Sequence, residues 1–429
     1  MKPVTLSLEI SATNAFLYSG YLYVFLADGS IGCINFNRLL WLVSMEDSEE
    51  MNFLKLIFLP NKHLKGETYN FLLNFKEIKS SIDSVIKKAF NRQVKYTVDE
   101  ADVKNILRKF GAFEELPLDV RLYCGELFVG SESGLYSTKL DIQSGFPVTG
   151  KSLNRIFDAG AISLNARGGI LAVSADNAGL FAYDLFKSGF MSDKPSYEKK
   201  SIRTDWSKSF SLVNYSTNDI FTFILNEVGQ IETQLNLPVR YRDDTKSKKA
   251  IIGFGESYVG MDDMISKQKF EESDIVYSLN SLSSGFFLLS DGKLEVRNLL
   301  NDKDDWRYST KSIYTANLRK HIRREKPLSA ITVPKGCVFE FYDKIILVQN
   351  GEITEIGNEP AFSIRSYITS HIFQNLITIV YEDHIDIVAL HYPPLPKNKT
   401  SANYKSGMTD FEVPDGYEAP DNNPVEYPF

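Results

Sequence analysis

Five histidines and two pairs of neighbouring acids are the residues of this chain best suited to metal or acid–base chemistry. The histidines are His63, His321, His371, His384 and His391. They form no HExxH motif and accompany no Cys-x-x-Cys pair, so their spacing predicts no metal site. The pairs Asp262-Asp263 and Glu271-Glu272 lie in a helix-like stretch, where neighbouring side chains point about 100° apart. They are therefore poor candidates for carboxyl groups that share a proton.

Two glycine-containing segments are further candidates for chemistry. Residues 253–258, GFGESY, begin like a dinucleotide-binding loop, but Tyr258 stands where the third glycine belongs. Residues 255–260 are one residue too long for a nucleophile elbow, and the sequence contains no Walker phosphate-binding loop. We therefore expect no catalytic residues, no metal and no cofactor, which describes a protein that is not an enzyme.

Positive charge is concentrated in residues 317–327, although the net charge of the chain is −7. The cations expected to contact phosphates are Arg319, Lys320, Arg323, Arg324 and Lys326. Further lysines lie in the charged segment 240–249, at Lys246, Lys248 and Lys249. Such clusters bind nucleic acid if they converge on one face, but charge runs more often form a solvated surface. Both interpretations stay open.

The composition changes sharply at Pro393. The last 37 residues hold seven of the 16 prolines, and beyond Ser406 they carry acidic residues and no Lys or Arg. This composition predicts an extended or disordered tail, separate from a domain at 1–392. Acidic residues with aromatic anchors are typical of docking peptides, so the residues expected to bind a partner are Phe411, Tyr417, Glu418, Tyr427 and Phe429. A solubilising tail and a tail that covers the chain's own basic loops are the alternatives.

The elements that would position these groups are short strands. Residues 161–186 form three apolar runs separated by Arg167-Gly168-Gly169 and by Asp176-Asn177-Ala178-Gly179. Runs with period-two alternation between such turns predict a meander. The pattern recurs at 21–36, 122–140, 212–237, 277–300, 338–356 and 372–390. From Ser133 onward, the second turns of successive units lie roughly 35 to 60 residues apart, a spacing that favours propeller blades.

On these repeats the chain resembles β-propeller proteins in general over residues 1–392. It has no Gly-His…Trp-Asp pair of the WD40 type, so no residue roles are implied by the resemblance. The expected fold is all-β: an irregular propeller of about seven blades. Val4–Leu8 is expected to close the ring beside Ile385–Leu390.

Residues 46–113 interrupt the rhythm. Phe53–Leu59 and Tyr69–Phe75 predict a hairpin, the remnant of a second blade. From Lys76 apolar residues recur at three and four positions, and the pattern returns over Asp99–Phe110. We therefore expect a helical insertion over about 76–116, which either covers a sheet edge or acts as a docking arm.

The cysteine content and the absence of an apolar leader bear on localisation. Three cysteines, Cys33, Cys124 and Cys337, favour reduced core residues and a cytoplasmic protein. No apolar segment approaches the roughly 18 residues of a membrane span, so no membrane association is expected.

The leading hypothesis is a non-catalytic scaffold or sensor subunit of an intracellular assembly. It would bind protein partners through propeller loops and the tail. A nucleic-acid-associated subunit that uses the basic loops is the first alternative. A propeller hydrolase or lyase with a site at the channel mouth is the second.

Overall fold

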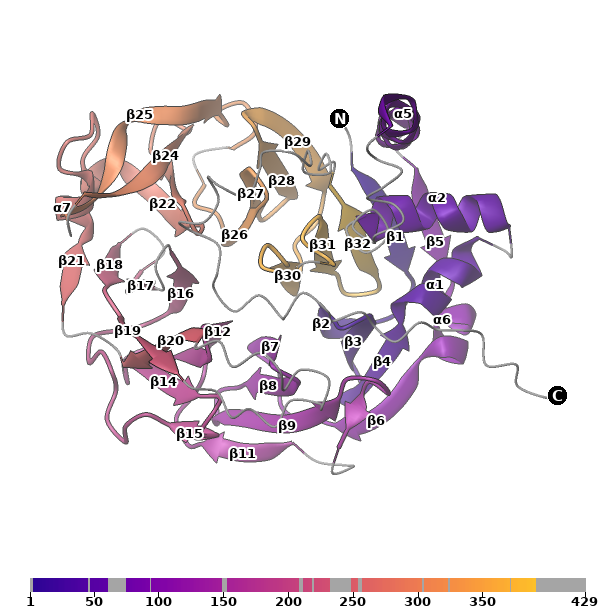
Figure 1. The fold of residues 1–429 in the computed structure, drawn as a ribbon, viewed down its shortest axis with the longest axis horizontal. Helices are drawn as coiled ribbons and strands as arrows, with labels where there is room; N and C mark the ends of the chain where they lie inside the picture. The colour runs from indigo at the N-terminus through magenta and orange to yellow at the C-terminus, as the bar shows by residue number, and fades with distance from the viewer. Residues whose placement is uncertain are drawn as a thin grey trace.

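Seven β-sheets surround a central axis in the computed structural model of this chain (Figure 1). The structure describes residues 3–390, except 45–46, 61–74, 93, 149–152, 208–210, 218–219, 232–247, 254–256, 303–304, 323–324 and 371. The fold is therefore the predicted seven-bladed propeller. Among the described residues, every helix is too short or too polar to traverse a lipid bilayer.

Each blade is a meander that runs from the axis outward. Blade one comprises β2 (Ala12–Tyr18), β3 (Tyr21–Leu26), β4 (Ser30–Asn35) and β6 (Arg108–Ala112). Blade two comprises β7 (Asp119–Tyr123), β8 (Glu126–Gly130), β9 (Leu135–Asp141), β10 (Phe146–Pro147) and β11 (Asn154–Phe157). Blade three comprises β12 (Ser163–Arg167), β13 (Ile170–Ser174), β14 (Leu180–Asp184) and β15 (Gly189–Phe190).

Blades four to seven continue around the ring. They comprise β16 (Arg203–Trp206), β17 (Leu212–Tyr215), β18 (Phe221–Ile224) and β21 (Tyr258–Gly260); β22 (Ile275–Asn280), β23 (Ser284–Leu289), β24 (Lys293–Asp302) and β25 (Asp305–Asn317); β26 (Ser329–Val333), β27 (Gly336–Phe341), β28 (Lys344–Gln349) and β29 (Glu352–Gly357); and β30 (Ser363–Ser366), β31 (Leu376–Val380), β32 (Ile385–Ala389), β1 (Val4–Leu8) and β5 (Lys95–Val98). Each innermost strand contacts the innermost strand of the next blade, and the ring closes where β30 contacts β2.

Blade three shows how the local sequence forms the meander. Strands β12, β13 and β14 pair antiparallel, with Arg167 opposite Ile170 at the first turn. Gly169 in this turn has a φ of +82°, and a Cβ there would lie 2.0 Å from the ring of Phe186. Only glycine fits both the left-handed backbone and the close approach, so this turn sets the register of the blade.

The ring is closed by the N-terminal strand, as predicted. Strand β1 pairs antiparallel with β32, from Val4 opposite Ala389 to Leu8 opposite Ile385. Blade seven therefore combines residues from both ends of the described chain. Separation of these ends would require loss of a full strand pair.

The two faces of the ring carry different connections. Strands alternate in direction, so turns between the first and second strands, and between the third and fourth, lie on one face, here named the lower face. Turns between the second and third strands, and connections to the next blade, lie on the upper face. The hairpin of β19 (Glu227–Ile231) and β20 (Lys248–Gly253) stands between β18 and β21 and leaves the lower face.

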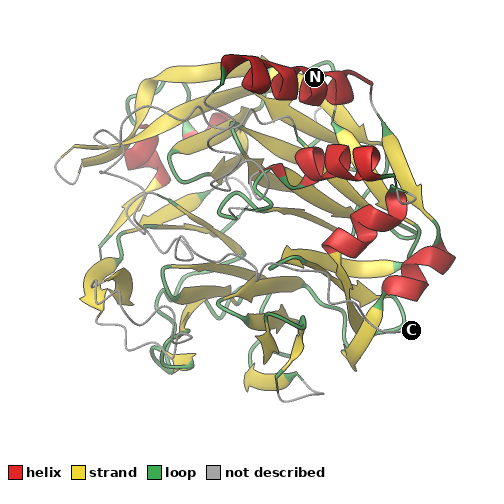
Figure 2. Ribbon diagram, turned by 45° about the vertical axis from the view of Figure 1, so that its right-hand side comes forward, coloured by secondary structure: helices red, strands yellow, loops and turns green. Residues whose placement is uncertain are grey.

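A helical insertion leaves blade one between β4 and β6. Among the residues of the insertion that the structure describes, the helices are α1 (Phe36–Val43), α2 (Ser48–Phe58), α5 (Lys76–Arg92) and α6 (Glu100–Ile106), and they gather on one side of the ring (Figure 2). Its strand β5 pairs in parallel with β1. The insertion thus adds an outermost strand to blade seven and joins this blade to blade one.

Two predictions in this region are wrong. Phe53–Leu59 is not a strand, because it lies in and directly after α2: Asp47 caps this helix by accepting from the N–H groups of Glu49 and Glu50. The hairpin partner expected at 69–75 falls almost entirely outside the described residues. The helix predicted over 99–110 ends at Ile106, because the next residues pair with β4 as the outer strand of blade one. Tertiary pairing therefore ends the insertion before residue 116.

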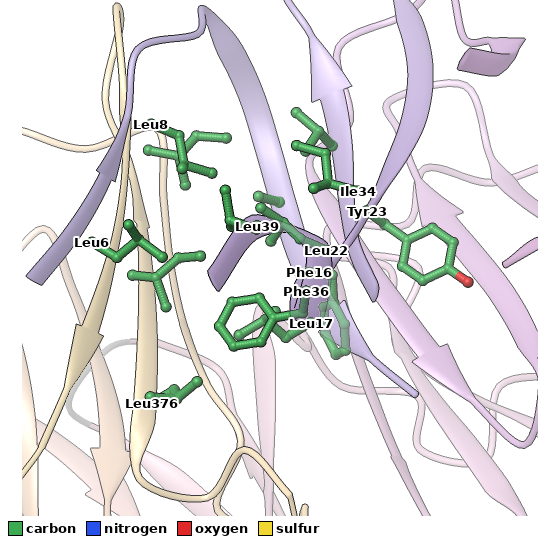
Figure 3. Close-up of a cluster of buried hydrophobic side chains, with 14 of the residues drawn as sticks. Leu6, Leu8, Phe16, Leu17, Leu22, Tyr23, Ile34, Phe36, Leu39 and Leu376 are labelled. Carbon is green, nitrogen blue, oxygen red and sulfur yellow. The ribbon is translucent and has the colours of Figure 1, made fainter. Parts of the chain in front are cut away.

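The core of this region joins β-strands and helices. In Figure 3, Leu6 and Leu8 of β1 and Leu376 of β31 belong to one buried cluster, with Phe36 and Leu39 of α1 packed between these strands and blade one. All five side chains are at most 1% exposed. Helix α1 is therefore held in place because one of its faces is buried against the strands that close the ring.

One smaller expectation also changes. Cys33 and Cys337 are buried free cysteines as expected, but Cys124 lies in an exposed turn with a φ of +51°. A turn that follows directly from β7 places this side chain outside the core.

Candidate interaction surface

The innermost strands carry charged side chains that join neighbouring blades. Asp119 of β7 accepts hydrogen bonds from the N–H groups of Val120 at 2.7 Å and Leu164 at 2.6 Å. Arg365 of β30 forms an ion pair with the same carboxylate. Its guanidinium also donates to Asn14 Oδ1 of β2 at 3.4 Å. One arginine of blade seven thus bonds to blades one and two.

Similar bonds link blades two, three and four. Arg121 donates to Asn165 Oδ1 at 3.2 Å, and Asn165 in turn donates to the carbonyl oxygen of Thr204 at 2.8 Å. Arg167 donates to the carbonyl oxygen of Ser207 at 2.6 Å. Each bond crosses from one blade to the next, so these polar side chains connect the inner edges of the sheets.

A buried network joins blades four and five. Asp205 Oδ2 accepts from the hydroxyl of Tyr215 and from the N–H of Asn280, each at 2.8 Å, and lies 3.3 Å from the Arg203 guanidinium. Burial, and then the Asp205 charge, raise the pKa of Tyr215 well above its usual value. Tyr215 therefore stays protonated and remains a donor. Its hydrogen-bond partner, Asp205, is itself held by Asn280 and Arg203.

Other candidate sites for chemistry are weak. The described residues contain no group of three or more His, Cys, Asp and Glu side chains placed to hold a metal. A pocket of about 290 Å³ is lined by Tyr21, Cys33, Asn35, Arg38, Ile106 and Arg108. Burial raises the pKa of the Cys33 thiol to about 11, so the thiol is not a nucleophile at neutral pH.

The residues expected to contact phosphates are only partly described. Arg319 and Lys320 lie in an exposed turn after β25, and Lys326 is exposed further along the same connection. This connection joins blade five to blade six on the upper face. Arg323 and Arg324 lie outside the described residues.

The structure does not bring all the basic segments together. Hairpin β19–β20 includes Lys248 and Lys249 and leaves the lower face, where Ile251 N donates to the Gly168 carbonyl oxygen at 3.4 Å. A third basic segment, residues 191–202 with Lys194, Lys199 and Lys200, connects blades three and four on the upper face, two blades from the connection at 318–328. Lys246 is outside the described residues. A joint site for the three segments would have to span both faces.

The predicted tail residues lie beyond the part of the chain that the structure describes. They are Phe411, Tyr417, Glu418, Tyr427 and Phe429. Their role in partner binding stays a prediction.

A surface that sequence analysis missed lies on the upper face at blades six and seven. Leu328, Tyr342 and Phe362 are 54%, 75% and 61% exposed. We name these three residues the upper-face apolar cluster. Leu328 N donates to the carbonyl oxygen of Glu340 at 2.8 Å, and Ala361 N donates to Glu340 Oε1, also at 2.8 Å. Glu340 therefore holds the connections that lead into Leu328 and Phe362, and it lies two residues before Tyr342 of the β27–β28 turn.

The base of this cluster is ordered by further bonds. Ser329 Oγ donates to Glu340 Oε2 at 2.5 Å, so both oxygens of this buried carboxylate accept hydrogen bonds. Phe362 N donates to the carbonyl oxygen of Val380 at 2.8 Å, at the end of β31. Exposed apolar side chains on a bonded, buried base are pre-organised for contact, because little chain entropy remains to be lost.

Charges of opposite sign flank the cluster. The basic connection of Arg319 and Lys320 leads into Leu328 on the blade-five side. On the blade-seven side the β31–β32 turn carries Asp383, whose Oδ1 lies 2.6 Å from His384 Nδ1, and the His384 ring stacks on Tyr381 at 4.4 Å. The surface is therefore electrostatically asymmetric.

A sequence signal for this cluster exists. The segments PLSAI at 327–331 and PAFSIR at 360–365 each place a large apolar residue directly before a serine that begins an innermost strand. Two successive connections share this pattern. Strand analysis alone assigns such residues to the core, and only their position at the rim exposes them.

Comparisons with known proteins assign the chain to no family. No protein-family model matches the chain, and no curated protein matches it either. Among solved structures, it is similar to the computationally designed Ika8 protein, with 9% identity, a TM-score of 0.47, and coverage of 91% of this chain and 100% of that one. It is also similar to the WD40 β-propeller domain of Doa1, with 6% identity, a TM-score of 0.43, and coverage of 91% and 93%.

A third solved structure is PorZ, a bacterial surface component of the type-IX secretion system of Porphyromonas gingivalis. The identity is 9% and the TM-score 0.45, with 90% of this chain covered. The chain spans 39% of the length of that protein. At these sequence identities and TM-scores, no partner or activity of the three proteins is assigned to this chain.

Proposed function

We propose that the chain is a non-catalytic protein-binding scaffold whose main contact surface is the upper-face apolar cluster. The observation that carries this proposal is the exposure of Leu328, Tyr342 and Phe362 on one bonded base. Neighbouring exposed apolar side chains commonly mark protein interaction sites. Two of the three are aromatic, the residue class that supplies much of the binding energy at interfaces.

The polar groups of the inner edge support a scaffold rather than an enzyme. Asp119, Arg365, Asp205 and Tyr215 are bonded to one another or to backbone groups of adjacent blades. A catalytic acid or base must instead be able to reach a substrate with its proton. The ring therefore uses its most strongly coupled polar side chains to hold its blades, and leaves binding to the surface.

Paired surface variants test the proposal. The full chain, Leu328→Glu/Phe362→Glu and Ile313→Glu would each be used to capture proteins from the native host, with quantitative mass spectrometry. Ile313 is a matched control because it is 49% exposed but lies on the outer strand of blade five. A charge in the cluster should reduce capture of the specific partner by at least about tenfold, since anchor residues contribute about 2 kcal/mol or more.

The control decides the interpretation. Capture that falls with the cluster variant and persists with Ile313→Glu supports the proposed surface. The same partners, retained equally by all three proteins, would exclude the cluster as the contact surface.

A further inference from the structure

The chain ends in a segment that complements the surface described above. Beyond Ser406 its charged residues are all acidic: Asp410, Glu412, Asp415, Glu418, Asp421 and Glu426. Its aromatic residues are Phe411, Tyr417, Tyr427 and Phe429. The segment therefore offers aromatic anchors to an apolar cluster and negative charge to the basic connection beside it.

We propose that residues 407–429 are the intramolecular ligand of the upper-face apolar cluster, so that a protein partner must displace them. This inference rests on the proposed function, because it names the regulation of that same surface. Aromatic side chains of the segment pack on Tyr342 and Phe362. Carboxylates of the segment face Arg319 and Lys320, two of the exposed cations of the connection between blades five and six.

The chain is long enough to reach. Strand β32 ends at Ala389 on the lower face, and the first innermost residues of the same blade, at Ser363, begin on the upper face. A strand of five residues spans about 17 Å, and neighbouring strands lie about 5 Å apart. The 21 residues from Leu390 to Phe411 extend to about 70 Å. The span therefore leaves slack, because the target lies on blade seven, from which the segment departs, and on the adjacent blade six.

The charge asymmetry sets the orientation of the bound segment. Its carboxylates are attracted by the connection on the blade-five side and repelled by Glu382 and Asp383 on the blade-seven side. Lys320→Glu should therefore weaken docking, and Glu382→Gln should strengthen it. A contact made by apolar packing alone would respond to neither change.

Tethering makes a weak contact sufficient. A segment tethered to its target by a short linker has an effective concentration of the order of 1 mM. An intrinsic dissociation constant of about 100 µM would then leave about nine molecules in ten closed. A free partner that competes for the same cluster would lose about tenfold in apparent affinity.

Zero-length carbodiimide cross-linking of the dilute full chain tests the proposal. The reagent joins carboxylates to amines in direct contact, and the monomer band would be mapped by mass spectrometry. We expect cross-links from Asp410 or Glu412 to Lys320 or Lys326. Their yield should fall at least fivefold in Tyr342→Ala/Phe362→Ala and at about 0.5 M salt, where charge attraction is screened. It should be unchanged in Ile313→Ala.

The exposed lysines of α5 provide an internal comparison. They include Lys76, Lys87 and Lys88, which lie on the helical insertion rather than at the cluster. Tail cross-links to these lysines alone, cross-links found only in dimers, or no tail cross-links at all would each overturn the proposal. Yields that do not change in the double variant would also overturn it.

The two proposals fail in different ways. If partner capture depends on Phe362 but the tail forms no cross-link, the contact surface stands and the tail is not its occupant. If the tail cross-links at Lys320 while Leu328→Glu/Phe362→Glu captures the same partners as wild type, the cluster is an internal docking site and the proposed function fails.

Discussion

Arg365→Ala removes the guanidinium that joins blade seven to blade two. The Arg365 side chain is 15% exposed and that of Asp119 11%, so the variant leaves a carboxylate with little access to water. Removal of one partner of a buried pair costs about 3–5 kcal/mol, because an uncompensated charge remains. Asp119 keeps its hydrogen bonds from Val120 N and Leu164 N. We therefore expect the lower end, a loss of about 3 kcal/mol in the free energy of unfolding.

Urea unfolding, followed by tryptophan fluorescence and circular dichroism, measures this loss. Lys104→Ala is the matched control, because Lys104 and Glu100 form a pair at 2.6 Å with both side chains 62% exposed. Its cost should stay below about 0.5 kcal/mol.

A second substitution separates the effect of losing the Arg365–Asp119 ion pair from the effect of leaving the Asp119 charge unpaired. Asp119→Asn, added to Arg365→Ala, removes that charge and should restore about 1–2 kcal/mol. If Arg365→Ala lies within about 1 kcal/mol of wild type, and the added change restores nothing, the inner polar groups do not hold the ring and the reasoning is refuted.

Three further predictions concern closure, thiols and acid stability. Leu6→Ala, at a fully buried position of β1, should lower the free energy of unfolding by about 3 kcal/mol, and an unchanged urea midpoint would show that β1 does not close the ring. Cys124 lies in an exposed turn, whereas Cys337 is buried and burial raises the pKa of its thiol well above the usual value. A thiol reagent at pH 7 should therefore label Cys124 in the folded protein and Cys337 only after unfolding, and equal labelling rates at the two positions would contradict this. Burial opposes ionisation of Glu295, but two cations bonded to its carboxylate outweigh burial and lower its pKa below 4.5. Its stabilising effect is therefore present above about pH 4.5 and is lost as the pH falls through the folded pKa, so the stability difference between wild type and Glu295→Gln should shrink in acid; a difference independent of pH would contradict this.

Much of the propeller follows from local pattern. Alternating apolar residues between turns such as Arg167-Gly168-Gly169 predict strands, because a half-buried strand has a period of two residues. The same rule fails for Phe53–Leu59, where a short apolar run fits a strand or a buried helix. The cap at Asp47, with Glu49 and Glu50 in the first turn, was the available signal for a helix.

The candidate surface was harder to predict. The basic residues Arg319 and Lys320 are visible as a charge run, but their face of the ring depends on strand direction in the blades before and after them. Leu328 and Phe362 resemble core residues in a one-dimensional pattern. They are exposed because each stands at the rim, one residue before its strand enters the sheet.

The chain's own pattern therefore specifies strands, turns, the repeat and the strand that closes the ring, since these depend on residues close in sequence or on one simple pairing. The bonds of Arg365 to Asp119 and of Ala361 to Glu340 depend on blade order and sheet geometry. Partners 246 and 21 residues apart become neighbours only when seven sheets pack into one ring. Burial then turns some charged groups into structural bonds, and the rim leaves three apolar side chains for contact with another surface.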